Sequence, residues 1–160
     1  RTQIVFLKDV PAGTPIGYSS TWRAPRATRI ATLPIGYHDG LPWALGNVGE
    51  VLVRGLRAPI VGRVSMDYIT VDVGHVPGAS VGDCVTVIGE DGAESISVED
   101  LARQAGTIPY EITCSFGRRV QRLYVGGEDL TIPSQRDPRP LERERSPKAS
   151  FRVPLPPPTS

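Results

Sequence analysis

Tyrosine, arginine and acidic side chains occur in four short segments, and these residue types can transfer protons or bind anions. The segments are GYSSTW (17–22), PIGYHDG (34–40), GRVSMD (62–67) and YEITC (110–114). A phenol donates or accepts a proton, and a guanidinium binds a carboxylate or a phosphate. Taken singly, each segment is more simply explained as an ordinary turn, or as a tyrosine whose hydroxyl has a hydrogen-bond partner.

Asp67 is the residue that an ordinary turn explains least well. It begins an apolar, β-branched run over residues 67–73. A buried carboxylate needs a partner, and Arg63 is close in sequence, so we expect these two side chains to pair. A lone methionine such as Met66 is more often core filler than a contact residue. Glu111 is expected to pair with one of the arginines that follow it.

Short strands are the elements that would position these segments. The 17 glycines and 16 prolines separate short apolar runs, a pattern typical of strands and turns. One helix is predicted, with Ser97 as N-cap and Gly106 just past its end. The sequence therefore predicts a mainly β fold, a small partly open barrel or sandwich of about 7–9 short strands with one short helix. Strands are expected over residues 2–7, 28–33, 49–53, 57–61, 67–73, 84–88, 110–115 and 119–125, with a hairpin turn at Arg54–Gly55.

The composition changes near residue 126. Residues 1–125 contain the apolar runs and are predicted to form the β domain. Residues 126–160 are rich in proline and charge, and we expect them to be a disordered tail. A proline-rich docking segment is the functional alternative for this tail.

Charge and length exclude several classes of protein. The 18 Lys and Arg residues nearly balance the 17 Asp and Glu residues, which gives no case for a nucleic acid or an acidic membrane surface as partner. No apolar run approaches the roughly 18 residues of a membrane span, and the amino end does not resemble a signal peptide. A chain of 160 residues is also too short for a TIM barrel plus a second domain.

Metal and disulfide chemistry have little support. The only histidines are His38 and His75, so no metal site is expected. The only cysteines, Cys84 and Cys114, lie in apolar stretches. We expect both to be small buried side chains in a reducing compartment.

The order and spacing of the segments indicate a protein family, which composition alone cannot do. Over about residues 2–125 the chain resembles the carboxy-terminal β domain of alanine racemases, which depend on pyridoxal phosphate. The matching segments are IVFLKDVPAGTPIGYSSTW, PIGYHDG, APIVGRVSMD, VGDCVTVIG, ARQAGTIPYEI and RVQRLY. APIVGRVSMD followed by GTIPYEI is the specific part of this resemblance.

The resemblance implies an isomerase that interconverts L-alanine and D-alanine. In such enzymes an amino-terminal TIM barrel binds the cofactor through a lysine, and the β domain completes the site across a head-to-tail homodimer. The resemblance further implies a cytoplasmic bacterial enzyme that supplies D-alanine for cell-wall peptidoglycan. Because the barrel is missing from this sequence, we expect the chain to be inactive alone.

The resemblance also implies roles for individual residues. Tyr18 corresponds to the catalytic base on the face opposite the lysine, since one base cannot reach both faces of the α-carbon. Met66 corresponds to the residue whose backbone amide contacts the substrate carboxylate, and Asp67 is expected to orient that turn. Tyr37 and Arg63 correspond to residues of the substrate entrance.

Three positions depart from the family pattern. Ser19 stands where a glycine often follows the catalytic tyrosine, and Trp43 stands where many members have arginine. Arg118 aligns with a tyrosine that touches the cofactor phosphate in some members, so it could bind phosphate or simply be solvated. Neither Lys8 nor Lys148 matches the cofactor lysine.

Two other functions remain open from the sequence. One is a racemase of another amino acid, such as serine. The other is a non-catalytic β module that binds a partner.

Overall fold

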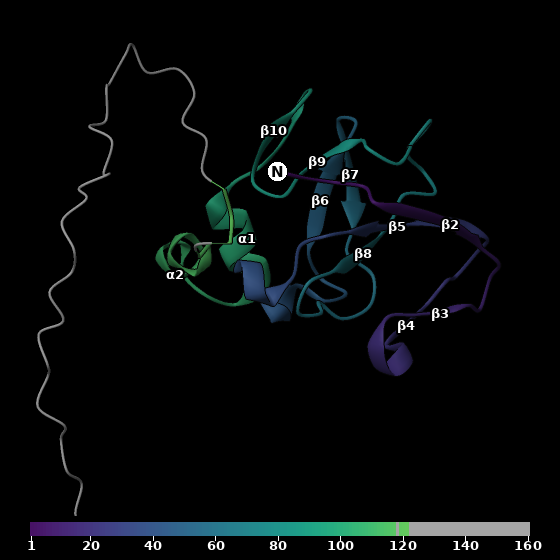
Figure 1. The fold of residues 1–160 in the computed structure, drawn as a ribbon, viewed down its shortest axis with the longest axis horizontal. Helices are drawn as coiled ribbons and strands as arrows, with labels where there is room; N and C mark the ends of the chain where they lie inside the picture. The colour runs from purple at the N-terminus through teal and green to yellow at the C-terminus, as the bar shows by residue number, and fades with distance from the viewer. Residues whose placement is uncertain (118, 122–160) are drawn as a thin grey trace, which may run out of the picture. The chain divides into compact units, whose positions relative to one another are not determined.

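Two antiparallel sheets form the framework of the part of the chain that the computed structural model describes, residues 1–117 and 119–121 (Figure 1). The larger sheet has the strand order β1-β9-β6-β7, with β1 (Thr2–Gln3), β9 (Cys84–Thr86), β6 (Glu50–Val53) and β7 (Leu56–Pro59). The second sheet has the order β2-β5-β8, with β2 (Phe6–Val10), β5 (Thr28–Leu33) and β8 (Ile69–Asp72). Two hairpins complete the β structure: β3 (Pro15–Ile16) with β4 (Trp22–Arg23), and β10 (Gly89–Asp91) with β11 (Glu94–Ile96).

One apolar core joins the two sheets. Val51 and Val53 of the larger sheet belong to the same buried cluster as Leu33 and Val71 of the second sheet. The sheets also connect along one edge, where Ile60 forms an isolated β-bridge with Val71. The predicted mainly β class is confirmed, as a sandwich-like domain rather than a closed barrel within the described range.

Most predicted strands exist, with shifted boundaries. The hairpin at Arg54–Gly55 is confirmed, and both residues have positive φ, 53° and 75°, as a tight turn requires. The strand predicted over 2–7 is divided into β1 and β2, which pair with different sheets. A second tight hairpin, β10–β11, follows β9. Residues 119–121 are not in a strand, and the rest of that predicted strand, like the predicted tail, lies outside the described residues.

The described residues form two α-helices where one was expected. The predicted helix is α1 (Val98–Ala105), and the strand predicted over 110–115 is wrong, because this segment forms α2 (Pro109–Ser115). Pro109 in the first turn suits the start of a helix. Glu111 in the same turn stabilises the helix, because its negative charge interacts favourably with the positive end of the helix dipole. Glu111 accepts a hydrogen bond from Thr107, and Arg119 pairs with Asp39 and Asp67 rather than with Glu111. Arg118 and Arg122, the other arginines of this prediction, lie outside the described residues. In Figure 1 the two helices lie together at one end of the domain.

The cysteine prediction is wrong in one respect. Cys84 and Cys114 are both free, but both are exposed rather than buried. Cys84 lies at the start of β9, where the side chains that face the core are those of its neighbours Val85 and Val87.

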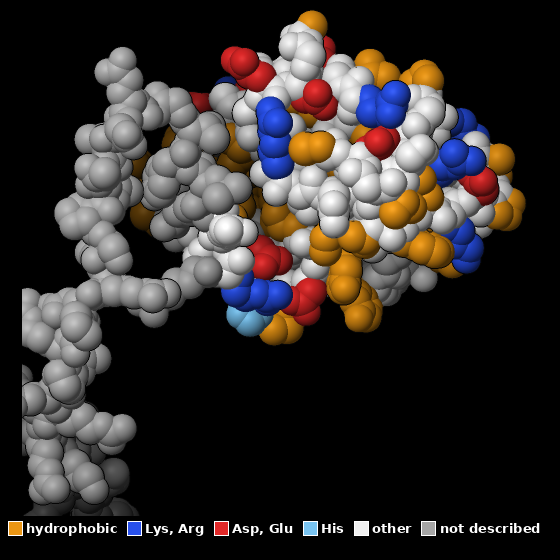
Figure 2. Space-filling view, turned by 45° about the horizontal axis from the view of Figure 1, so that its top comes forward, with side chains coloured by type: hydrophobic (Ala, Val, Ile, Leu, Met, Phe, Trp, Pro, Cys, Tyr) orange, Lys and Arg blue, Asp and Glu red, His pale blue; other side chains and the backbone are white. Residues whose placement is uncertain are grey.

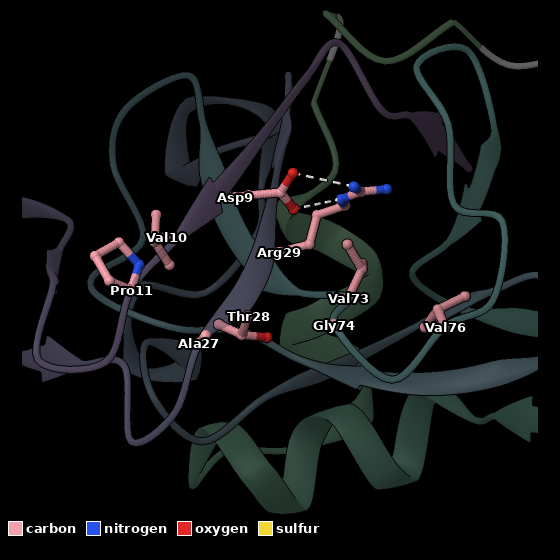
Figure 3. A pocket seen from close by; sticks show the side chains of 9 residues that line it. All are labelled: Asp9, Val10, Pro11, Ala27, Thr28, Arg29, Val73, Gly74 and Val76. Atoms are coloured by element: carbon pink, nitrogen blue, oxygen red, sulfur yellow. Dashed lines mark hydrogen bonds and ion pairs between the residues drawn. The ribbon is translucent and has the colours of Figure 1, made fainter.

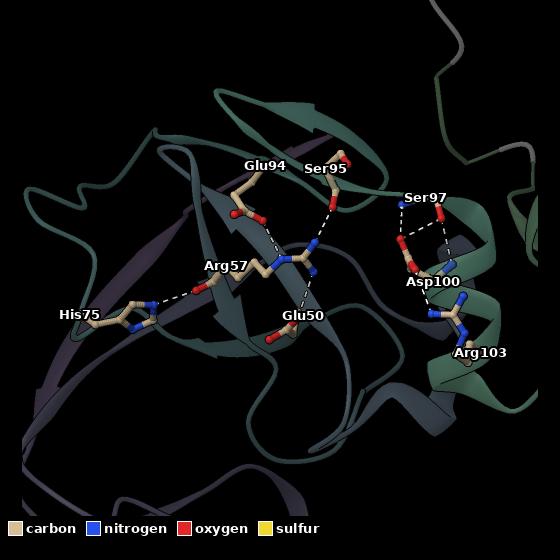
Figure 4. Close-up of polar contacts among 8 residues, drawn as sticks. All are labelled: Glu50, Arg57, His75, Glu94, Ser95, Ser97, Asp100 and Arg103. Carbon is tan, nitrogen blue, oxygen red and sulfur yellow. Dashed lines mark hydrogen bonds and ion pairs between the residues drawn. The ribbon is translucent and has the colours of Figure 1, made fainter.

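Arg57 connects three strands on the outside of the larger sheet (Figure 4). Its guanidinium donates to Glu94 in β11 at 2.7 Å and to Glu50 in β6 at 3.1 Å. It also donates to the carbonyl of Ser95 at 2.6 Å. The hydrogen bond with Glu94, and then the one with Glu50, raise the pKa of Arg57. The cluster fixes the β10–β11 hairpin against the sheet and lies apart from the predicted site residues.

Asp72 is the buried carboxylate of the fold. It is 4% exposed at the end of β8 and accepts hydrogen bonds from the Thr28 hydroxyl and from the Gly74 amide. Arg26 lies 3.8 Å away. These contacts join β5, β8 and the turn that follows β8. They also compensate the free-energy cost of burying the Asp72 carboxylate.

We expect Asp72→Ala to lower the free energy of unfolding by about 2 kcal/mol, because the buried Thr28 hydroxyl loses its acceptor. Urea denaturation of the purified chain measures the change. Asp9→Ala is the control, since Asp9 forms an exposed ion pair with Arg29. An equal effect of the two substitutions would contradict the role of Asp72.

The cap of α1 gives a second test. The Ser97 hydroxyl accepts from the Asp100 amide, and the Asp100 carboxylate accepts from the Ser97 amide and hydroxyl. These bonds, and then Arg103, lower the pKa of Asp100. A lowered pKa in the folded state stabilises the fold above the unfolded pKa of about 4, and this stabilisation is lost as the pH falls through the folded value.

We expect Ser97→Ala to lower the free energy of unfolding by about 1 kcal/mol at neutral pH. The difference from the parent chain should shrink as the pH falls below about 4, because the acceptor Asp100 becomes protonated. Urea denaturation across a pH series measures both effects. Ser95→Ala is the matched control. A pH-independent difference would argue against a contribution from the bond between the Ser97 hydroxyl and the Asp100 carboxylate.

Candidate functional site

The Tyr18 loop is the tip of the β3–β4 hairpin. A short 3-10 turn, η1 (Tyr18–Ser20), contains Ser19 at φ 61° and Ser20 at φ 50°. Non-glycine residues adopt this left-handed region at a cost of about 1–2 kcal/mol, which explains why a glycine suits the position of Ser19. The tight turn leaves Tyr18 73% exposed.

Backbone packing fixes this loop against the segment that precedes Met66. A Cβ added to Gly17 would lie 3.2 Å from the Cα of Gly62, and both glycines have positive φ. Asn47 adds a polar link, since its side chain accepts from the Gly62 amide at 2.6 Å and donates to the Thr21 hydroxyl at 3.2 Å. The phenol-bearing loop is therefore held by contacts that only glycine permits.

Met66 and Asp67 occupy the tip of a closed turn. The Ser65 amide and hydroxyl both donate to the carbonyl of Tyr68, and the Tyr68 amide donates to the Ser65 hydroxyl. The Met66 amide has no acceptor among the residues that the structure describes, whereas its carbonyl accepts from the His38 amide at 3.1 Å. An amide N–H left over by a turn can donate to an anion.

The Tyr37 loop is joined directly to the Met66 turn. It contains η2 (Tyr37–Asp39), and the Tyr37 amide donates to the carbonyl of Ser65 at 3.0 Å. A Cβ on Gly36 would lie 2.3 Å from the carbonyl oxygens of Ser65 and Met66, so no other residue fits there without displacement. The Ser115 hydroxyl at the end of α2 donates to the carbonyl of Gly40 and supports the loop from behind.

Arg63 lies over the ring of Trp43 rather than beside Asp67. Its guanidinium carbon is 5.2 Å from the ring centroid, a cation–π distance. Trp43 belongs to η3 (Trp43–Leu45), which follows the Tyr37 loop. The Arg63 Nε atom is buried and has no hydrogen-bond partner within the described range.

The predicted pairing of Asp67 with Arg63 is therefore wrong. Asp67 is partly exposed, lies outside β8, and accepts a hydrogen bond from Arg119 at 3.0 Å. Residues 65–68 form a turn before β8, which begins only at Ile69, so the Asp67 carboxylate stays outside the core and does not need a buried partner.

A single open cavity of about 520 Å³ brings the predicted residues together. Five of the six predicted site residues line it, although they come from segments as far apart as Tyr18 and Asp67. Arg118, the predicted phosphate contact, lies outside the described residues. The complete lining is Tyr18, Tyr37, Trp43, Arg63, Val64, Ser65, Met66, Asp67 and Tyr68.

Sequence reasoning missed three residues that hold this arrangement, Trp43, Asn47 and Arg119. Trp43 was noted only as a departure from the family. Asn47 lies between glycines in GNVG and has φ 63°, so the left-handed preference of asparagine was the signal available. Arg119 opens the closing RVQR segment, but nothing in the sequence indicates that two distant carboxylates would meet there.

A second hollow, of about 570 Å³, contains none of the predicted site residues (Figure 3). It is open, and the ion pair of Asp9 with Arg29 crosses one side of it. The hydrogen bond with Arg29 lowers the pKa of Asp9. Because both partners already neutralise each other, this hollow offers no unpaired charge to a ligand.

Large apolar side chains are exposed around the cavity. Tyr18, Tyr37, Trp43, Met66 and Tyr68 are each 45–73% exposed. Figure 2 shows that hydrophobic side chains reach the surface between charged ones on the face it presents. Exposed apolar patches of this kind commonly mark an interaction surface.

Neither a metal nor a membrane helix is indicated by the described residues. They contain no group of three or more His, Cys, Asp or Glu side chains placed to hold a metal ion. None of their helices is long and apolar enough to cross a membrane.

Known proteins match most of this chain in sequence and in fold. The family model for the alanine racemase C-terminal domain matches residues 1–124. The alanine racemase of Halothermothrix orenii is 52% identical over 130 residues, which are 79% of this chain and 34% of that protein. The alanine racemase of Syntrophobacter fumaroxidans is 52% identical over 127 residues, 79% of this chain and 34% of that protein.

Solved structures give the same result. An alanine racemase from a D-cycloserine-producing Streptomyces lavendulae matches with a TM-score of 0.74 and 36% identity, over 79% of this chain and 33% of that one. An alanine racemase from Bartonella henselae, solved with covalently bound pyridoxal phosphate, matches with a TM-score of 0.71 and 37% identity, over 77% of this chain and 33% of that one.

The chain spans about a third of the length of these relatives, and the matched region includes every residue that lines the cavity. With 124 of its 160 residues covered by the family model, the chain belongs to the alanine racemase C-terminal domain family.

Proposed function

We propose that this chain is the carboxy-terminal part of an alanine racemase and supplies one half of its active site. The proposed reaction is the interconversion of L-alanine and D-alanine, which supplies D-alanine for peptidoglycan synthesis in the bacterial cytoplasm. The observation that carries the proposal is that Tyr18 and the Met66 turn line one cavity. Its open side would face an amino-terminal barrel domain, in a head-to-tail homodimer.

Tyr18 is the proposed base for one face of the substrate α-carbon. Racemisation requires a proton to leave from one face and return on the other, so two bases on opposite sides are needed. The exposed Tyr18 phenol on a loop fixed by Gly17 and Asn47 satisfies the requirement for a positioned base from this side. This role also requires a cationic side chain of the partner domain beside the Tyr18 hydroxyl, to stabilise the negative charge of the base.

Met66 is the proposed contact for the substrate carboxylate. Its amide N–H has no acceptor within the described residues, and the turn around it is closed by three hydrogen bonds. Asp67 at the same tip orients the turn through Arg119. Tyr37 and Arg63 line the proposed entrance to the cavity, and the charge of Arg63 attracts the carboxylate of the substrate.

Pyridoxal phosphate, when bound, would withdraw electrons from the α-carbon and make its proton removable. The residues of this chain fit only the outer side of such a site. The lining of the cavity includes one arginine and no lysine, and Lys8 lies in β2, paired in register with Ile30. We therefore assign cofactor anchoring mainly to the amino-terminal domain, with Arg118 as the phosphate contact proposed from this chain.

The domain boundary follows the same division. We propose that the racemase-like domain extends over residues 1–125 and that residues 126–160 form a separate proline-rich tail.

The role of Tyr18 can be tested in a chimera that joins the amino-terminal domain of the Halothermothrix orenii relative to residues 1–124 of this chain. We expect Tyr18→Phe to reduce racemisation and α-proton exchange from L-alanine by about 10²–10⁴-fold, because one of two bases is lost. Exchange is measured in deuterated water, and absorbance reports whether the cofactor is still bound.

Tyr110→Phe is the matched control, since Tyr110 is 78% exposed on α2 and does not line the cavity. Unchanged racemisation by the Tyr18→Phe chimera would refute the role of Tyr18. A chimera that racemises serine faster than alanine would instead support a racemase of another amino acid.

The isolated chain gives an independent prediction. Supplied with pyridoxal phosphate and L-alanine, it should form no D-alanine, because the anchoring lysine and the opposite base are absent. Chiral chromatography of the reaction measures this. Turnover above the rate of free cofactor would contradict the two-domain proposal.

A further inference from the structure

Arg119 lies between two carboxylates that belong to different loops of the cavity. Its Nε atom is 3.4 Å from an oxygen of Asp39, and one of its terminal nitrogens is 3.0 Å from an oxygen of Asp67. The Asp39 side chain is only 13% exposed, whereas Asp67 and Arg119 are 44% and 47% exposed. One guanidinium thus bridges two acids that are 28 residues apart in the sequence.

Each acid is linked to a proposed substrate contact. Asp39 ends the Tyr37 turn and accepts from the Gly36 amide at 2.9 Å, which fixes its carboxylate relative to that loop. Asp67 directly follows Met66 at the tip of the other turn. The Arg119 bridge is therefore a second link between these two loops, in addition to the hydrogen bond from the His38 amide to the Met66 carbonyl.

Charge gives the bridge a second consequence. Without Arg119, two carboxylates would remain uncompensated beside the amide that is proposed to receive a third, that of the substrate. Like charges at this spacing oppose binding of the anion. Exposed ion pairs contribute little to folding stability, so the main effect of Arg119 should be on substrate binding.

We propose that Arg119 is a positioning residue of the racemase reaction. It locks the Asp39 loop to the Asp67 turn and offsets one of their two negative charges, so that the Met66 amide meets an alanine carboxylate in a fixed setting with less negative charge. This inference rests on the proposed function of the Met66 turn.

The test uses the same chimera. Arg119→Met should raise the KM for alanine by about tenfold, since small displacements of a binding group have effects of this order. The kcat should change by less than about threefold, because Tyr18 and the cofactor are untouched. Arg119→Lys keeps the charge but not the two-sided geometry, and should recover part of the loss.

A background that lacks both carboxylates separates positioning from general disruption. In the Asp39→Asn/Asp67→Asn variant, Arg119→Met should change KM by less than about twofold, because the groups it couples are gone. Arg103→Met is the matched control, since Arg103 forms a similar ion pair with Asp100 in α1, at 3.1 Å. If Arg119→Met does not fold, Arg119→Lys in both backgrounds decides the question by the same comparison.

The outcomes distinguish this inference from the proposed function. If Tyr18→Phe abolishes racemisation but Arg119→Met leaves KM unchanged, or raises it equally in both backgrounds, only the role of Arg119 is refuted. If Tyr18→Phe leaves the reaction intact, the proposed function itself fails.

Discussion

Close approach of backbone to backbone is the constraint on which the cavity depends. Gly36 packs against the carbonyls of Ser65 and Met66, and Gly17 packs against Gly62. No side chain larger than hydrogen fits at Gly36 without displacing backbone atoms, and at Gly17 and Gly62 the left-handed conformation adds to the crowding. Three loops from distant parts of the chain thereby share one rigid junction. The proton transfer that we propose for this cavity would need such rigidity, since its groups must be placed to within a fraction of an ångström.

The sandwich supplies the support behind this junction. The Met66 turn leads into β8, whose Val71 is buried between the sheets, and the Tyr37 loop follows β5 through Leu33. β5 and β8 are antiparallel neighbours in one sheet, and Leu33 at the end of β5 pairs with Ile69 at the start of β8. The two loops therefore lie side by side at the same end of these strands. Asp72 fastens the far end of this strand pair to Thr28. A shift in the pairing of β5 with β8 would therefore displace the loops that line the cavity.

The cavity is open and rimmed by exposed aromatic side chains, which is the form expected of half a site. A complete active site buries most of its ligand, whereas Tyr18 here is 73% exposed. Arg63 stacks on Trp43 beside the cavity. These features agree with a second domain covering the face, and the relatives are about three times as long as the matched region.

The sequence by itself determined the family, the mainly β class, α1 with its Ser97 cap, and five residues of the cavity. These follow from local chemistry and from ordered motifs, which a linear sequence carries in full. Only the tertiary structure decided that residues 110–115 form a helix, that Cys84 and Cys114 are exposed, and that Asp67 pairs with Arg119 rather than Arg63. The arginine that pairs with Asp67 depends on how separate segments pack. Arg63, four residues away in the sequence, competes with Arg119, which the fold brings close. The short segment after Pro109 was ambiguous for the same reason, because its periodicity could not distinguish a strand from two turns of helix.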